Sequence, residues 1–370
     1  MTTLKQLLDH YCSENVQYVQ LGEVVSYEQP TKYLVKSTDY DDAFETPVLT
    51  PGKTFLLGYT DETNGIYEAS PAEPVIIFDD FTTANKWVDF PFKSKSSAIK
   101  ILTPKNESIS LRFAFLAMQD LEVDTTDHKR QWIRTFSKEL IPFPPREVQD
   151  KIVEILDTFA ALCENLDTEI TQREQQLAAY REKLLSVDYL THQHCPDGVK
   201  YERLGNVVAI RNGSDWKTQE PGDIAVYGSG GKMEAQVKVA ASMEPSVLLP
   251  RKGSLEVQFV ESPFWNIDTV FRTETDPSHL AMKYFYYCME EVDLSEISTS
   301  ATRPSLTQTA LKRLVLPLPP RDVQDEIIAK LDAMQELIDN LRLEREQRQQ
   351  QFDYYREKLL SFPQKETAEV

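Results

Sequence analysis

The chain has 370 residues, 41% of them hydrophobic, which is enough to bury the cores of two ordinary domains and argues against overall disorder. It has no run of about 18 apolar residues and no basic leader sequence, so we expect a cytoplasmic protein without a membrane span. The net charge of −19 weighs against a nucleic-acid-binding protein with a basic face, because phosphate contacts need Lys and Arg.

Residues 1–140 have the pattern of a mixed α/β domain that begins with a short helix. Runs such as PVIIFDD and SAIKIL alternate with the turn signals TPGK and TNG, and SLRFAFLAMQDL near Ser110 has a helical pattern. Residues 86–105 hold five lysines against a single acid, and residues 129–138 hold four basic residues and no acid. Local charge therefore marks these two stretches as candidates for phosphate contact, although the average charge does not.

Residues 141–190 predict a long helix after a proline pair. No Pro or Gly occurs in residues 146–186, and a continuous helix of this length would span roughly 60 Å. Apolar residues recur mostly at alternating steps of three and four, as in the seam of a coiled coil; the stripe begins Val148, Ile152, Ile155, Phe159 and Leu162.

Residues 191–315 and 316–370 repeat this order. SVLLP and VQFVE predict strands, GSGGK and RKGS predict turns, and HLAMKYFYYCMEE near His279 predicts a helix. A second proline pair then precedes a second long helix.

Self-comparison shows that the chain is a tandem repeat. IPFPPREVQDKIVEILD begins at Ile141 and LPLPPRDVQDEIIAKLD at Leu316, an offset of 175, and AYREKLLS and YYREKLLS keep that offset. HYCSENVQYVQLGEVVS at His10 matches QHCPDGVKYERLGNVVA at Gln193. The repeated frame thus encloses two dissimilar inserts. Because both helices carry the same stripe, we expect them to pair antiparallel within one chain; homodimerisation through the stripes is the alternative.

Several motifs that suggest chemistry lack a necessary part. PGKT at Pro51 has Pro47 where a phosphate loop needs glycine, and YGSGGK at Tyr227 is followed by no acid at the spacing of a dinucleotide site. The four cysteines form no CxxC pair, so we expect them to be reduced and structural. We therefore expect no catalytic, cofactor-binding or metal-binding residues in this chain.

The repeated PxPPR(E/D)VQDxI(I/V)xxLD, followed each time by a long helix ending in YREKLLS and separating two dissimilar inserts, resembles the specificity subunit of type I restriction-modification enzymes. The resemblance covers nearly the whole chain. It implies an α+β fold with two target recognition domains, 1–140 and 191–315. These would be separated by two long helices, 141–190 and 316–370, paired as an antiparallel coiled coil with a pseudo-twofold internal repeat.

The resemblance also implies a non-catalytic DNA-binding role. Each recognition domain would read one half of a bipartite, asymmetric double-stranded DNA target, and a rigid spacer predicts half-sites about one helical turn apart, near 34 Å. The helices would dock two modification (methyltransferase) subunits and two restriction (translocase and nuclease) subunits. S-adenosylmethionine, ATP and Mg²⁺ are expected in those partners and not in this chain.

DNA contacts are expected from basic side chains in the inserts, because Arg and Lys bond guanine or phosphate. The candidates are Lys86, Lys93, Lys95, Lys129, Arg130, Lys217, Arg251, Lys252 and Arg303. The acidity is expected to lie largely on the helices and on surfaces that face partners.

A coiled-coil structural adaptor that does not read DNA is the alternative function. It predicts similar inserts, since a scaffold gains nothing from two divergent ones. A nucleotide-dependent enzyme would need the phosphate loop that Pro47 interrupts.

Overall fold

The computed structural model describes residues 4–12, 16–52, 54–121, 123–125, 129–299 and 304–363. The chain forms two compact units: unit 1 is Met1–Asn165 with Arg345–Val370, and unit 2 is Leu166–Glu344. Two 40-residue helices, α4 (Arg146–Leu185) and α9 (Arg321–Leu360), each contribute one end to each unit and confirm the two predicted long helices. None of the helices in the described ranges is long and apolar enough to span a bilayer.

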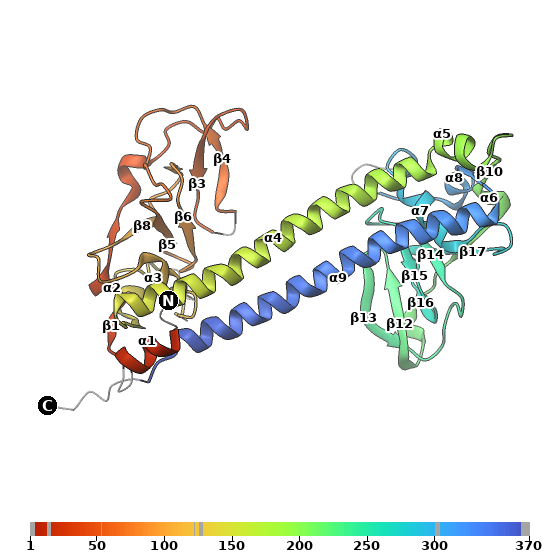
Figure 1. The fold of residues 1–370 in the computed structure, drawn as a ribbon. Coiled ribbons are helices and arrows are strands. Elements are labelled where there is room, and N and C mark those ends of the chain that lie inside the picture. Colours follow the sequence, from red (N-terminus) through yellow and green to blue (C-terminus); the bar gives the residue numbers. More distant parts are fainter. Residues whose placement is uncertain are drawn as a thin grey trace. The chain divides into compact units, whose positions relative to one another are not determined.

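Unit 1 contains a four-stranded antiparallel sheet in the order β2-β8-β5-β6, a three-stranded sheet β4-β3-β7 and the two-stranded ribbon β1-β9 (Figure 1). Within the second sheet, β3 pairs antiparallel with β4 and parallel with β7. The strands are β1 (Tyr18–Gln20), β2 (Val25–Glu28), β3 (Thr46–Leu49), β4 (Leu56–Thr60), β5 (Val75–Asp79), β6 (Asn85–Val88), β7 (Lys93–Ser94), β8 (Ile99–Pro104) and β9 (Leu140–Pro142). The short helices are α1 (Leu4–Tyr11), α2 (Leu21–Val24), α3 (Leu111–Met118), η1 (Pro30–Tyr33) and η2 (Phe136–Lys138).

Unit 2 repeats this topology, with sheets β11-β17-β14-β15 and β13-β12-β16 and the ribbon β10-β18. Here β12 pairs antiparallel with β13 and parallel with β16. The strands are β10 (Tyr201–Arg203), β11 (Val208–Asn212), β12 (Pro221–Gly228), β13 (Gly231–Val237), β14 (Ser246–Pro250), β15 (Gln258–Val260), β16 (Phe264–Asn266), β17 (Val270–Thr275) and β18 (Val315–Pro317). The short helices are α5 (Val187–Tyr189), η3 (Leu190–His194), α6 (Leu204–Val207), η4 (Trp216–Thr218), α7 (Met282–Glu290) and α8 (Gln308–Leu311).

In each unit one inner strand of the four-stranded sheet is buried on both faces: β5 in unit 1 and β14 in unit 2. Ile76 and Phe78 of β5 share a core with α3 and α4, while Val75 and Ile77 share a second core with the three-stranded sheet. Because successive side chains of a strand point to opposite faces, a strand covered on both sides becomes a continuous apolar run. This explains PVIIF, and β14 explains SVLLP in the same way. The predicted mixed α/β inserts are therefore confirmed.

The two long helices pack together within each unit. In unit 1 the rings of Phe159, on α4, and Tyr355, near the end of α9, stack with centroids 5.3 Å apart. In unit 2, Glu174 of α4 and Arg342 of α9 form an ion pair of 2.6 Å. The start of one helix thus lies beside the end of the other, which confirms the predicted antiparallel pairing within one chain.

The predicted seam along α4 is partly wrong. Leu162 is 42% exposed, whereas Leu156 and Cys163 are buried. The first buried apolar residues, Val148, Ile152 and Leu156, are four residues apart, because this part of α4 packs against α3 and the sheet as well as against α9. A helix with two different neighbours buries a wider stripe than a coiled-coil seam.

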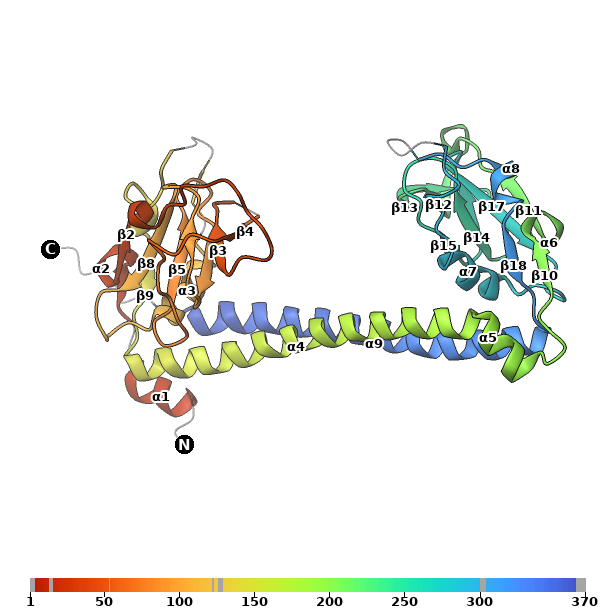
Figure 2. The same ribbon diagram turned by 90° about the horizontal axis from the view of Figure 1, so that it is seen from above.

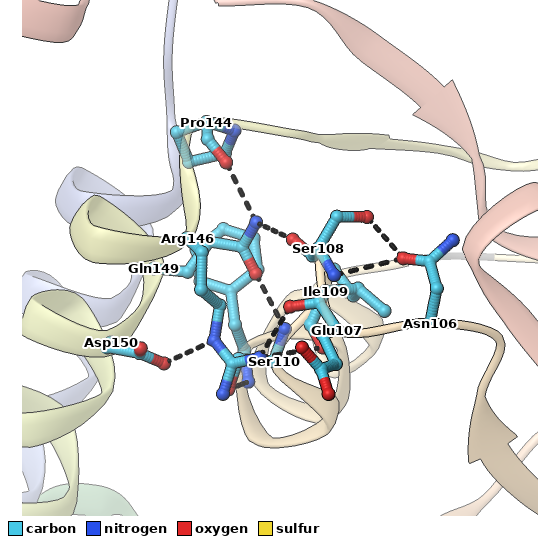
Figure 3. Close-up of polar contacts among 10 residues, drawn as sticks. Asn106, Glu107, Ser108, Ile109, Ser110, Pro144, Arg146, Gln149 and Asp150 are labelled. Atoms are coloured by element: carbon cyan, nitrogen blue, oxygen red, sulfur yellow. Dashed lines mark hydrogen bonds and ion pairs between the residues drawn. The ribbon is translucent and has the colours of Figure 1, made fainter.

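A buried glutamine joins each long helix to its unit. The side chain of Gln149 is fully buried, and its Oε1 accepts from the backbone N–H of Ser110 over 2.8 Å (Figure 3). Its Nε2 donates to the carbonyl oxygens of Ser108 (3.1 Å) and Pro144 (2.8 Å). One amide therefore satisfies three backbone groups, at the N-terminus of α3 and in the proline turn before α4.

The same contact recurs in unit 2. Gln324 Oε1 accepts from the N–H of Ala281 over 2.9 Å, and its Nε2 donates to the carbonyl oxygens of His279 and Pro319. The repeated Val-Gln-Asp thus encodes a backbone clamp rather than a chemical site.

Two arginines complete the clamp in each unit. Arg146 pairs with Asp150 over 2.7 Å and donates to the Glu107 carbonyl oxygen over 2.8 Å (Figure 3). Near the end of α9, Arg356 pairs with Asp120, just after α3, over 3.0 Å.

In unit 2, Arg321 at the start of α9 corresponds to Arg146: it pairs with Asp325 and donates to the Pro277 carbonyl oxygen. Arg181, near the end of α4, corresponds to Arg356: it pairs with Glu290 over 2.6 Å and with Glu291. The arginine of each YREKLLS segment therefore holds the C-terminal end of α3 or α7.

We expect Gln149→Ala to destabilise unit 1 by about 1–3 kcal/mol, because it leaves buried backbone groups without partners. Native-state hydrogen exchange should show faster exchange in α3 with little change in unit 2. Gln324→Ala should have the mirror effect on α7. Gln350→Ala, which removes an exposed glutamine whose amide donates to Glu346, is the control; equal acceleration in both units by Gln149→Ala would contradict the local role.

Candidate nucleic-acid interface

One end of unit 2 is built from the turns between its strands, and Figure 2 shows the β12–β13 hairpin on the side remote from α9. The N–H of Ser229, in the hairpin turn, donates to Thr269 Oγ1 over 3.1 Å. The N–H of Arg251, just after β14, donates to the Thr269 carbonyl oxygen over 2.8 Å. A Cβ added at Gly253 would lie 2.9 Å from Ser229 Oγ. These touching turns form the tip of unit 2, which comprises residues 228–231, 251–253, 267–269 and 304–306.

The segment that returns toward α8 runs across this tip. The N–H of Leu306 donates to the Arg251 carbonyl oxygen over 3.0 Å, and the N–H of Gly253 donates to the Pro304 carbonyl oxygen over 3.2 Å. The predicted DNA-contacting residue Arg303 directly precedes this segment but lies outside the described residues.

Arg251 and Lys252 differ in how firmly they are held. The Arg251 guanidinium lies 5.9 Å from the Phe271 ring centroid, and its Nη1 donates to the Asp268 carbonyl oxygen over 3.2 Å. Lys252 is exposed, and its backbone bridges to Ser305. Both predicted residues therefore lie at the tip. The Arg251 side chain is held by a hydrogen bond and a ring contact, whereas Lys252 is positioned through its backbone bridge.

The loop that carries Lys217 packs against the strand leading into the tip. The N–H of Ser214 donates to the Asn266 carbonyl oxygen over 3.1 Å. A Cβ at Gly213 would lie 2.0 Å from the Ile267 carbonyl oxygen, so only glycine permits this approach. Lys217 is exposed at the next turn of the loop.

Unit 1 has an equivalent tip, formed by residues 80–86 and 129–132. The N–H of Gln131 donates to the Asp80 carbonyl oxygen over 2.8 Å, which is the counterpart of the contact from Leu306 to Arg251. Lys129 and Arg130 are exposed immediately before this contact. Lys129 and Arg130 thus precede Gln131 in unit 1 as Pro304 and Ser305 precede Leu306 in unit 2. The structure places both predicted residues at the tip of unit 1.

Lys86 and Lys95 are also exposed. Lys86 lies on edge strand β6 opposite Ile77, and the turn that joins β5 to β6 is part of the tip. Lys95 follows β7, where its ammonium lies 5.5 Å from the Tyr40 ring centroid.

Lys93 is different, because its side chain is only 2% exposed. Its ammonium pairs with Glu62 over 3.2 Å and donates to the Asn64 carbonyl oxygen over 2.5 Å. Backbone N–H donation from Ser37, with Lys93 nearby, lowers the pKa of Glu62, so this carboxylate is ionised at neutral pH. Lys93 therefore holds the β4–β5 loop in this structure.

Asp80 and Lys100 were not predicted from the sequence, yet they lie at the base of the unit 1 tip. Their charged atoms are 3.0 Å apart, and both side chains are 1% exposed. Two consecutive acids at the end of a fully apolar strand, in PVIIFDD, were the available signal.

Comparison with known proteins gives a consistent family. Residues 13–174 and 196–351 match the model of the type I restriction modification DNA specificity domain. The chain is 35% identical over 411 aligned residues to the type I restriction enzyme EcoR124I/EcoR124II specificity subunit of Escherichia coli, covering 100% of this chain and 99% of that protein.

Solved structures share the fold. The S subunit of a type I restriction-modification system from M. genitalium aligns with a TM-score of 0.66 at 17% identity, covering 98% of this chain and 99% of that chain. A chain from a structure concerned with complex assembly and conformational transition of the type I R-M system aligns with a TM-score of 0.51 at 15% identity, covering 94% and 96%.

Proposed function

This chain belongs to the specificity subunits of type I restriction-modification systems, which recognise DNA sequences, and we propose that its two units read the two halves of one split, asymmetric target. The observation that carries the proposal is that one topology is built twice with different residues at its tip. Asp80 in unit 1 and Arg251 in unit 2 make the same backbone contact to the returning segment. Equivalent surfaces with unlike side chains suit unlike half-sites.

The proposed contacts are the predicted basic residues other than Lys93; those in the described ranges are exposed or partly exposed, and Arg303 lies outside these ranges. Arg and Lys position DNA through phosphates and can read guanine in the major groove. Lys93 is left out because protein atoms already hold its ammonium. The proposed set is Lys86, Lys95, Lys129, Arg130, Lys217, Arg251, Lys252 and Arg303. The proposed reading domains are residues 1–140 and 191–315, and the helical segments are 141–190 and 316–370.

The partners follow from the repeated frame. We propose that the chain is non-catalytic and acts in the cytoplasm with two methyltransferase subunits and, in a restriction complex, two translocase and nuclease subunits. The clamp repeated at Gln149 and Gln324 gives both units the same frame beside α4 and α9, which suits two copies of one partner. S-adenosylmethionine, ATP and Mg²⁺ would be bound by those partners.

The decisive experiment is to map methylated bases in cells that carry the cognate methyltransferase subunit, with and without this chain. Loss of methylation at one split motif on deletion would establish the proposed reading and identify both half-sites. Methylation at a single contiguous motif would contradict it.

The net charge of −19 predicts that the isolated chain binds DNA weakly, because most phosphate contacts would come from partners. Fluorescence anisotropy with a duplex that contains the mapped target should show much tighter binding by the assembled methyltransferase complex. Equal affinity of the isolated chain and the complex would contradict this account of the acidity.

The double variant Arg251→Gln and Lys252→Gln should weaken DNA binding by the complex and make it less sensitive to salt. If both side chains contact phosphates, the slope of log K against log salt should fall by about 2, since each phosphate contact contributes about 0.9. Lys200→Gln is the control, because Lys200 is exposed but pairs with Glu202 away from the tip. An unchanged slope would exclude phosphate contacts by this pair.

A further inference from the structure

Asp80 is a buried carboxylate that joins three parts of unit 1. Its backbone N–H donates to the Ala98 carbonyl oxygen over 2.9 Å, at the start of β8. Its Oδ2 pairs with the Lys100 ammonium over 3.0 Å. Its Oδ1 accepts from the N–H of Trp132 over 2.8 Å, and its carbonyl oxygen accepts from the N–H of Gln131. The carboxylate thus connects β5 and β8 to the segment that carries the exposed basic residues.

The segment 129–132 is anchored at its far end as well as at Asp80. The Trp132 ring packs edge-on against Phe78 with centroids 5.1 Å apart, so Trp132 fixes the end of the segment. Arg130 is 53% exposed, and its Nε lies 4.0 Å from Asp80 Oδ2. Asp80 is therefore a buried charged group that bonds to the backbone of this segment and lies beside the Arg130 guanidinium.

Unit 2 uses a different arrangement at the same place. In the sheet register Lys100 is opposite Phe78, two residues before Asp80, and Phe271 is opposite Leu249, two residues before Arg251. Asp80 thus corresponds to Arg251, and Lys100 to Phe271. Where unit 1 has a buried ion pair, unit 2 has a partly exposed guanidinium over an aromatic ring.

This difference changes where each tip can present positive charge. In unit 2 the residue after the central strand is itself a cation at the surface. In unit 1 that position is a buried anion already paired with Lys100, so the exposed cations come from Lys86 of β6 and from the returning segment, which the anion holds.

We propose that the buried Asp80–Lys100 pair is a positioning device that orders residues 129–132 for DNA contact and so determines the reading of one half-site only. The inference rests on the proposed function. Neither side chain touches DNA in this mechanism, because both are 1% exposed. They act through the backbone of Gln131 and Trp132 and through Arg130.

The test uses the double variant Asp80→Asn and Lys100→Met in the full chain assembled with its methyltransferase subunit. Asn keeps an oxygen that accepts from the N–H of Trp132, and Met is an unbranched apolar side chain that replaces the Lys100 ammonium, which lies 5.6 Å from the Tyr27 ring centroid. Because both charges are removed together, no unpaired buried ion remains, and the fold is expected to persist. Lys100→Met alone leaves a buried carboxylate without its main partner and should melt at lower temperature.

Binding is measured to duplexes that carry the mapped target and to duplexes with single base-pair changes in each half. The double variant should lose discrimination roughly tenfold in one half, which corresponds to loss of one specific base contact, and keep it in the other. The control is Glu28→Gln with Lys32→Met, which neutralises an exposed pair in the same unit and should change neither half.

Unchanged discrimination in both halves, or an equal loss in both, would overturn the positioning role. A merely structural effect would lower affinity for every duplex by the same factor and leave the ratios intact, which would also overturn it. If the unmodified complex itself discriminated neither half, the proposed function would fail, and this outcome is seen before any variant is compared.

Discussion

The architecture depends on the buried amide of one glutamine in each unit. Gln149 and Gln324 each satisfy a helix N-terminus and a proline turn with a single side chain, and this links each of two dissimilar domains to one of the two repeated helices. Because the amide contacts only backbone atoms, the residues around it are free to differ. The same link therefore supports two inserts whose sequences have little in common, as a subunit that reads two different half-sites requires.

The sequence predicted the elements of the fold better than their surfaces. The repeat offset of 175 placed both long helices, and apolar runs placed the central strands β5 and β14. The stripe on α4 was misread at Leu162, because periodicity gives the buried face only when a helix has one neighbour. The role of Gln149 could not be predicted, since a polar residue between Val148 and Asp150 reads as the solvent face of a helix.

The candidate interface was harder to predict, because exposure and charge are separate properties. Lys93 lies in β7 and Lys95 directly follows this strand, yet one ammonium is enclosed by Glu62 and carbonyl groups and the other lies beside Tyr40. Asp80 is acidic and buried, so a search for basic groups passes over it. Its importance appears only when the returning segment is seen to bond to it, a contact between residues 52 positions apart.

The arginines near the ends of the long helices have a consequence for synthesis. In unit 2 the arginine that holds the end of α7 is Arg181, and it is translated before the strands and helices that follow α4. In unit 1 the arginine that holds the end of α3 is Arg356, which bonds to Asp120, 236 residues earlier in the sequence. Unit 1 is therefore translated first but completed last. The core around α3 lacks the side chains of α9 until the end of that helix has been translated. Such distant closure is slow, so a nascent chain exposes apolar surface of unit 1 throughout translation of unit 2.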